Sequence, residues 1–279
     1  MLHHSGLFGG KVMRGTSIVG CFVLLSGPCS VATAGSLQPL TPWNIAYEES
    51  QCTASRDYGS AAKPITLTLI PSVSGTGLRL LFVRNGATAT TQEAAELTFG
   101  GRKKLETYAF IYGVPTTHHR VSMVNVLMKD FLAKTTEPSI EIRSASLNVQ
   151  MSVDQRSQLF AELAKCLKDL REYWNWDGSE IKFSPDSRVD ATLPALLSAD
   201  DYPAIAYNHG LSGRDGMTVL IDQSGNVADC TVDEPSGVGI LDATSCSVFE
   251  KRAKFQPAID KQGKTTRSAS GTHITWQVK

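Results

Sequence analysis

The sequence lacks an excess of charge of either sign. Lysine and arginine together number 27 in a chain of 279 residues, and aspartate and glutamate also number 27. Domains that bind nucleic acid usually carry a basic excess where they contact the phosphates. The balance therefore argues against a nucleic-acid partner, and the 42% hydrophobic content is that of an ordinary globular protein.

Familiar catalytic motifs are also missing. The sequence contains no G-x-S-x-G, H-E-x-x-H, G-x-G-x-x-G or P-loop pattern. His118 and His119 are adjacent, and neighbours on a strand point to opposite faces, so we expect surface residues at a turn and no metal site. We thus expect no enzyme and no cofactor. Catalytic partners can meet only in the fold, so an enzyme in the N-terminal region is kept as a second alternative.

No apolar run is long enough to cross a bilayer comfortably, which takes about 20 residues. The longest near the N-terminus, residues 18–25, follows Lys11 and Arg14 and precedes Ala32-Thr33-Ala34. Basic residues, a short apolar run and an A-x-A site are typical of a cleaved signal peptide. We predict a signal peptide over residues 1–34 and export of the remainder.

Two alternatives concern the same segment. It could stay uncleaved as an inner-membrane anchor, or be lipidated at Cys21 or Cys29, although the flanking residues fit lipidation poorly. The natural start could be Met1 or Met13.

Four of the six cysteines lie beyond the predicted signal peptide: Cys52, Cys166, Cys230 and Cys246. An even number in an exported chain predicts two disulfides. Four cysteines permit three pairings. Proximity in sequence favours Cys230–Cys246, which leaves Cys52–Cys166.

The region 37–190 reads as a β-rich α+β domain. The patterns predict strands over residues 43–47, 65–70, 78–83, 105–112, 120–127 and 140–142, with a hairpin between the second and third. Residues 153–174 show apolar side chains three and four apart, which predicts a helix. Ser152 and Gln155 have the spacing of a capping box. Residues 191–200 read as a short linker.

The region 201–279 predicts a second, smaller α+β domain. Residues 217–222 and 227–232 form a predicted hairpin around Gly225, residues 241–253 a helix, and residues 272–278 a final strand. This order suits a helix packed on a three-stranded antiparallel sheet.

The C-terminal region resembles the TonB C-terminal family. The resemblance covers about 80 residues, and the segments that carry it are Tyr202-Pro203-Ala204, Asp222 with Gly225, Ser236-Gly237, Leu241-Asp242 and the run from Arg252 to Ala258. In that family an inner-membrane energy transducer grips a short peptide of an outer-membrane transporter in the periplasm. The peptide adds a strand to the edge of the sheet.

By resemblance, the partner would meet the last strand and the segment that enters the domain. These residues are Tyr202, Pro203, Thr272, His273, Ile274, Thr275, Trp276, Gln277 and Val278. The same edge could pair with a second copy of the chain.

The chain departs from the transducer plan, because its membrane segment looks cleavable and a proline-rich spacer is missing. We therefore expect a periplasmic protein-binding module that is linked to transmembrane transport, with a membrane-anchored energy transducer as the first alternative.

Overall fold

The computed structural model describes residues 36–101, 104–132, 138–183 and 196–278. The predicted signal peptide lies outside these ranges, and so do residues 191–195 of the predicted linker. The fold is α+β as predicted, with a β-rich N-terminal region and a C-terminal helix packed on a three-stranded antiparallel sheet.

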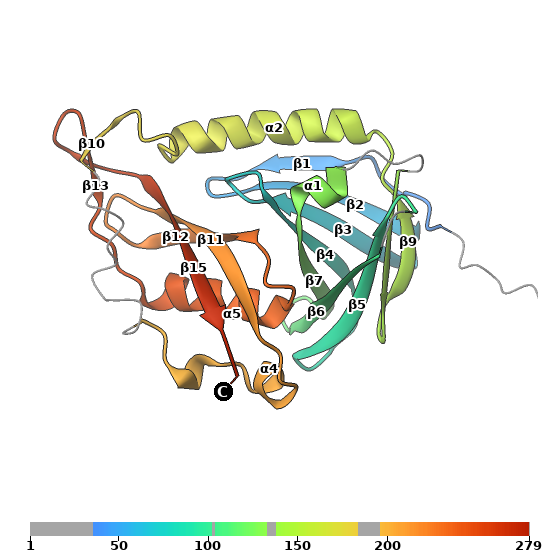
Figure 1. The fold of residues 1–279 in the computed structure, drawn as a ribbon. Helices are drawn as coiled ribbons and strands as arrows, with labels where there is room; N and C mark the ends of the chain where they lie inside the picture. The colour runs from blue at the N-terminus through green and yellow to red at the C-terminus, as the bar shows by residue number, and fades with distance from the viewer. Residues whose placement is uncertain (1–35, 102–103, 133–137, 184–195, 279) are drawn as a thin grey trace, which may run out of the picture. The chain divides into compact units, whose positions relative to one another are not determined.

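The N-terminal region is built on one large curled sheet (Figure 1). Its strands are β1 (Asn44–Tyr47), β2 (Cys52–Ser60), β3 (Lys63–Pro71), β4 (Gly77–Asn85), β5 (Thr91–Phe99), β6 (Leu105–Val114), β7 (His119–Leu127), β8 (Ser139–Ser144) and β9 (Asn148–Ser152). The strand order is β1-β2-β3-β4-β7-β6-β5-β8-β9, and each neighbouring pair is antiparallel. The six predicted strands are confirmed, whereas β2, β5 and β9 were not predicted.

The first described residues close the sheet into a barrel. Leu37 bridges to Met151 in β9, and Pro39 bridges to Tyr58 in β2. The Leu37 amide donates to Gln150 O at 2.7 Å. Alternate residues of each strand therefore face an enclosed interior, and Leu67, Leu80, Phe82, Val124 and Ile142 are fully buried there.

Helix α2 (Arg156–Tyr173) lies across one end of the barrel (Figure 1). The predicted apolar stripe is confirmed, since Leu159, Leu163, Cys166, Leu167 and Leu170 are buried. Cys166 forms a disulfide with Cys52 of β2, as expected. The predicted capping box is wrong: Ser152 ends β9, and the N-cap is Gln155, with a φ of 55° and no side-chain cap.

The C-terminal region contains β11 (Gly213–Ile221), β12 (Val227–Glu234), α5 (Gly239–Arg252) and β15 (Ser268–Trp276), with sheet order β12-β11-β15. The short elements η1 (Ala199–Asp201) and α4 (Ala204–Asn208) precede it. A small separate sheet joins β10 (Ile181–Phe183), β13 (Ala258–Asp260) and β14 (Thr265–Thr266), and α1 (Met128–Leu132) follows β7.

Two boundaries differ from expectation. The final strand begins at Ser268 and ends at Trp276, so Gln277 and Val278 lie beyond it. Leu196, inside the predicted linker, packs into the C-terminal core.

The two regions pack closely against each other. A Cβ added at Gly77 in β4 would lie 1.9 Å from the carbonyl oxygen of Val232 in β12. A Cβ at Gly239 in α5 would lie 2.9 Å from Tyr108 O in β6. Leu220 of β11 belongs to the hydrophobic core of the barrel. The C-terminal sheet is thus docked on the outer wall of the barrel.

The disulfides generate a first prediction. Cys230 and Cys246, 16 residues apart, join β12 to α5, and the other bridge closes a loop of 114 residues. Replacing Cys230 and Cys246 with serine should lower the free energy of unfolding by about 3 kcal/mol, and the Cys52/Cys166 pair by about 4–5 kcal/mol. Urea unfolding followed by circular dichroism measures both, and an unchanged midpoint for either double variant would contradict the bridge.

A second prediction concerns docking. Gly77→Ala should push β12 away from β4 and lower the Tm by several degrees, because backbone atoms cannot yield as a side chain does. Gly271→Ala is the matched control, since its Cβ would meet nothing closer than 3.9 Å. Equal Tm values for the two variants would contradict the close contact.

Candidate functional site

Strand β15 is the edge strand of the C-terminal sheet that lies farthest from β12. At the other edge, β12 lies against the barrel: the side chain of Ser74 hydrogen-bonds to Asp233, and Thr76 Oγ1 donates to Asp233 O at 3.4 Å. The central strand β11 is paired on both sides. In the described part of the chain, β15 pairs with β11 alone, so a row of its backbone groups has no strand beside it.

The two faces of β15 differ. Ile274 and Trp276 are buried toward α5, whereas Gly271, His273 and Thr275 are exposed on the opposite face. His273 lies 3.4 Å from Glu234 of β12, and it reaches that residue across Gly216 of β11. An added Cβ at Gly216 would lie 2.9 Å from His273 Nε2, so glycine leaves room for this contact.

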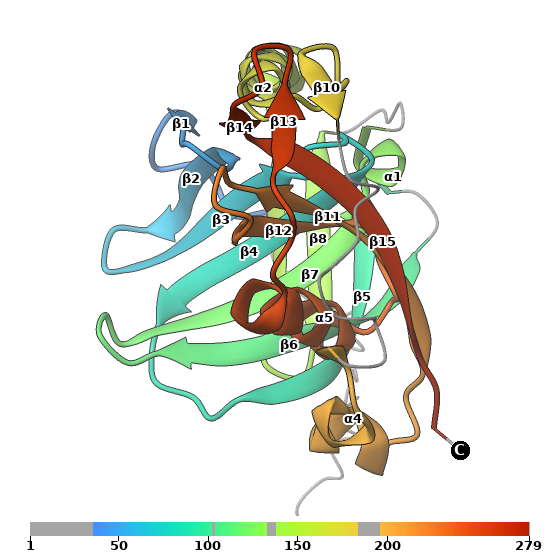
Figure 2. The same cartoon turned by 90° about the vertical axis from the view of Figure 1, so that its left-hand side faces the viewer.

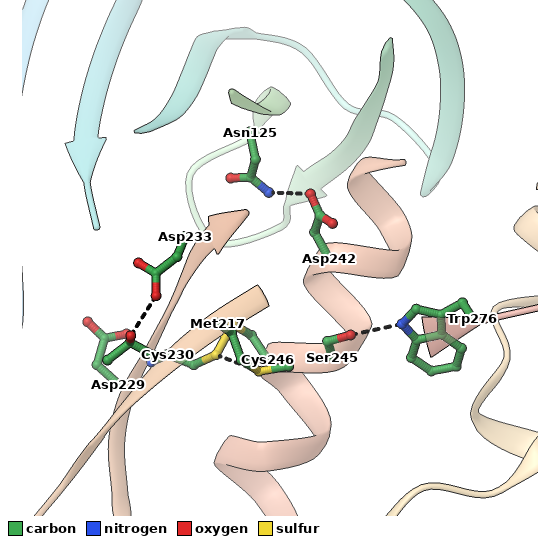
Figure 3. The surroundings of a disulfide bond; sticks show 10 residues. Asn125, Met217, Asp229, Cys230, Asp233, Asp242, Ser245, Cys246 and Trp276 are labelled. Carbon is green, nitrogen blue, oxygen red and sulfur yellow. Dashed lines mark hydrogen bonds between the residues drawn. A yellow bond between two sulfur atoms is a disulfide. The ribbon is translucent and has the colours of Figure 1, made fainter. Parts of the chain in front are cut away.

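Trp276 fastens the end of β15. Its indole Nε1 donates to Ser245 Oγ of α5 at 2.9 Å (Figure 3). The ring of Tyr202 packs edge-on against it, with centroids 5.4 Å apart. The Tyr202 hydroxyl donates to Leu211 O at 2.5 Å. The structure thus brings together two of the residues chosen by resemblance, and in this state they hold the strand in place.

The other chosen residues are distributed around that contact. Pro203 is the N-cap residue of α4, next to Tyr202. Thr272, His273, Ile274 and Thr275 lie on β15 itself. Beyond the strand, the Val278 amide donates to Ser212 Oγ at 3.2 Å.

The segment that enters the domain is held by an ion pair. Arg252 at the end of α5 donates from Nη2 to Asp201 Oδ1 at 2.6 Å, and from Nη1 to Leu196 O at 3.0 Å. The hydrogen bond from Arg252 lowers the pKa of Asp201 to about 2. Arg252 belongs to the segment that carries the resemblance to the TonB C-terminal family. In the structure it holds in place the segment that leads from Leu196 to Tyr202.

A buried carboxyl group lies beneath β15. Asp215 of β11 is opposite Ile274 and has no exposed surface, and neither carboxylate oxygen has a hydrogen-bond partner of normal geometry. Burial raises the pKa of Asp215 to about 7, although the Ser245 hydroxyl opposes this rise. Nearby Asp242 adds a smaller rise, and the Ile274 amide a smaller opposing effect. Asp215 is therefore partly protonated near neutral pH.

Asp242 of α5 is the second buried carboxyl group, and it links the two regions. Asn125 Nδ2 of β7 donates to it at 2.9 Å (Figure 3). The Ser236 amide also donates to it, at 2.9 Å. Burial raises its pKa as well.

The sequence reasoning missed Asp215, although a signal was present. Asp215 has the same alternation as Met217 and Val219, which face the core beneath α5. An aspartate at a position that should be buried is an unusual feature that could have been noticed.

Other expected features can be placed as well. His118 lies in the turn before β7, with a φ of 51°, and His119 begins that strand. Across the described ranges, no group of three or more His, Cys, Asp or Glu side chains could hold a metal ion. None of the helices that the structure describes combines the length and apolar character needed to span a bilayer.

Asp215 gives a prediction with a defined sign. Its pKa is raised in the folded state, so the free energy of unfolding should fall as the pH rises from about 4 to about 7. Asp215→Asn should remove that dependence, so the loss of stability between pH 4 and pH 8 should be roughly 2–4 kcal/mol smaller in the variant than in the unmodified protein. Urea unfolding at both pH values tests this, with Asp200→Asn at an exposed site as control. Parallel pH profiles for Asp215→Asn and the unmodified protein would contradict it.

Comparison with known proteins assigns the C-terminal region. No curated protein matches the chain. Residues 198–278 match the family model described as the Gram-negative bacterial TonB protein C-terminal, so this part of the chain is a TonB-like C-terminal domain.

Proposed function

We propose that this protein is a periplasmic binding module that captures an extended segment of a partner protein by β-strand addition along the outer edge of β15. The observation that carries the proposal is the asymmetry of the sheet. Barrel residues cover β12, whereas the described residues leave the edge of β15 unpaired. An added strand would satisfy backbone groups that otherwise face water.

The chemistry of the edge supports an extended peptide as the ligand. Main-chain hydrogen bonds supply the affinity in strand addition, and alternate side chains read the sequence. Here His273 and Thr275 are exposed on one face of the strand. Gly271 lies on the same face and has no side chain, so a partner's side chain can lie against the backbone there. The fastening of Trp276 by Ser245 and Tyr202 keeps the strand extended before the partner arrives.

The family match of residues 198–278 supports an outer-membrane transporter as the partner. The signal-peptide pattern of residues 1–34 supports a periplasmic location for the remainder. In this proposal the chain acts by binding and not by catalysis. A membrane-anchored energy transducer would use the same edge. The two are separated by the N-terminal residue of the mature protein and by its extraction with carbonate.

Proline substitution on β15 tests the binding mode. N–H groups alternate between the two sides of a strand, so either Thr272→Pro or His273→Pro removes one that faces the open edge. The variant whose proline removes an edge-facing N–H should keep a Tm close to that of the unmodified protein. The variant whose proline removes an N–H that pairs with β11 should unfold at a lower temperature. Alanine at both positions provides the matched controls.

The readout is a photoreactive residue at Thr275 in living cells, with captured proteins identified by mass spectrometry. We expect capture of an outer-membrane transporter through its N-terminal segment, lost with the tolerated proline and retained with alanine. A photoreactive residue at exposed Gln262, in the turn between β13 and β14, should not capture it. Capture of a second copy alone, or capture that persists with the proline, would overturn the proposal.

A further inference from the structure

Two arginines face each other inside the barrel, at the end away from α2. Arg84 of β4 is directly opposite Arg120 of β7. Arg84 lies on the same face of its strand as Leu80 and Phe82, which are fully buried in the barrel core. Arg120 likewise lies on the same face of its strand as Val124. Like charges directly opposite on neighbouring strands destabilise a sheet.

One carboxylate accompanies the two guanidinium groups. Glu93 Oε1 lies 3.5 Å from Arg120 Nη2. Its other oxygen is occupied by Ser144 Oγ at 2.8 Å and the Ser146 amide at 2.9 Å. The group of Arg84, Arg120 and Glu93 therefore keeps a net positive charge, and it lies within the wall of the barrel.

The donors of this group are incompletely used. Arg84 Nη2 reaches Ser146 Oγ at 3.2 Å, whereas the Nε atoms of Arg84 and Arg120 are buried without a hydrogen-bond partner. Ser122 lies two residues after Arg120 on β7, on the same inward face. It has no exposed surface, and its hydroxyl also has no hydrogen-bond partner. Burial lowers the pKa of Arg84, and the charge of Arg120 lowers it further.

The surroundings place the arginines at the mouth of an apolar interior. Further inside, Phe82, Ile111 and Val124 belong to the fully buried apolar core of the barrel. Gly113, opposite Arg120, has no side chain, and the backbone of Thr88 passes close to it. The Arg120 side chain is 24% exposed, so the group can be reached from solvent.

We propose that this end of the barrel binds a small oxyanion, a phosphate or a carboxylate, between Arg84 and Arg120. The anion accepts hydrogen bonds from the Nε and Nη groups of the two arginines, which present the paired donors that such anions fit. Rotation of the long arginine side chains turns the unpaired Nε–H groups toward the ligand. The hydroxyl of Ser122 is the innermost donor.

The test is thermal unfolding of the exported chain in phosphate or in acetate, at constant ionic strength, against sodium chloride. Ligand that binds only the folded state should raise the Tm by about 5 °C or more once it exceeds Kd a hundredfold. A response to phosphate alone identifies a phosphate ligand, and one to acetate alone a carboxylate. Equal Tm values in all three salts would overturn the proposal.

Variants locate the binding. Arg120→Met should abolish the shift while leaving the Tm in chloride unchanged or higher, because the repulsion with Arg84 is relieved. Arg120→Lys keeps the charge without the paired donors and should weaken binding about tenfold. Ser122→Ala should fold normally and weaken binding several-fold. Arg143→Met, at an exposed arginine of the same barrel, is the matched control. A shift that survives both Arg84→Met and Arg120→Met would place the anion elsewhere and refute the site.

Discussion

The docking of β12 and α5 on the outer wall of the barrel is the contact on which the remaining architecture depends. It rests on positions without side chains, Gly77 and Gly239, where backbone meets backbone. It also buries the hydrogen bond between Asn125 and Asp242, since both residues are almost fully shielded from solvent. Because one edge of the small sheet is used in this way, only the opposite edge is left for a partner.

The same docking explains why the C-terminal domain can carry a polar interior. Asp215 of β11 is fully buried beneath α5, and its carboxylate has no hydrogen-bond partner of normal geometry, a state that costs stability in any small domain. The disulfide between β12 and α5 and the packing of Leu220 on the barrel core offset that cost. The barrel thus supports the binding domain as well as occupying one of its edges.

Much of this fold could be predicted from the sequence, because the relevant signals are local. The stripe of α2, the hairpin of β3 and β4, and the strand, helix and strand of the C-terminal domain all follow from apolar spacing. Strands β2 and β5 could not be recognised in that way. Their inward positions include Arg56, Glu93 and Ala95, which weaken the alternation that marks a strand.

The site was predictable only in part, for a related reason. Resemblance selected Tyr202 and the last strand, and the structure brings Tyr202 onto Trp276. Whether a strand is an open edge depends on what packs beside it from far away in the sequence. The pairing of Arg84 with Arg120 likewise depends on a register between strands that are 36 residues apart, which no local pattern contains.

Because Leu37 and Pro39 pair with strands of the barrel, the chain before Leu37 is the only part that could link the barrel to an N-terminal membrane anchor. If the apolar run that ends at Leu25 stayed in a membrane, 12 peptide units would separate it from Leu37. A fully extended chain of that length spans at most about 40 Å. An uncleaved run would then keep Leu37 within that distance of the membrane. A cleaved chain would have no such tether and could diffuse to any membrane that encloses its compartment.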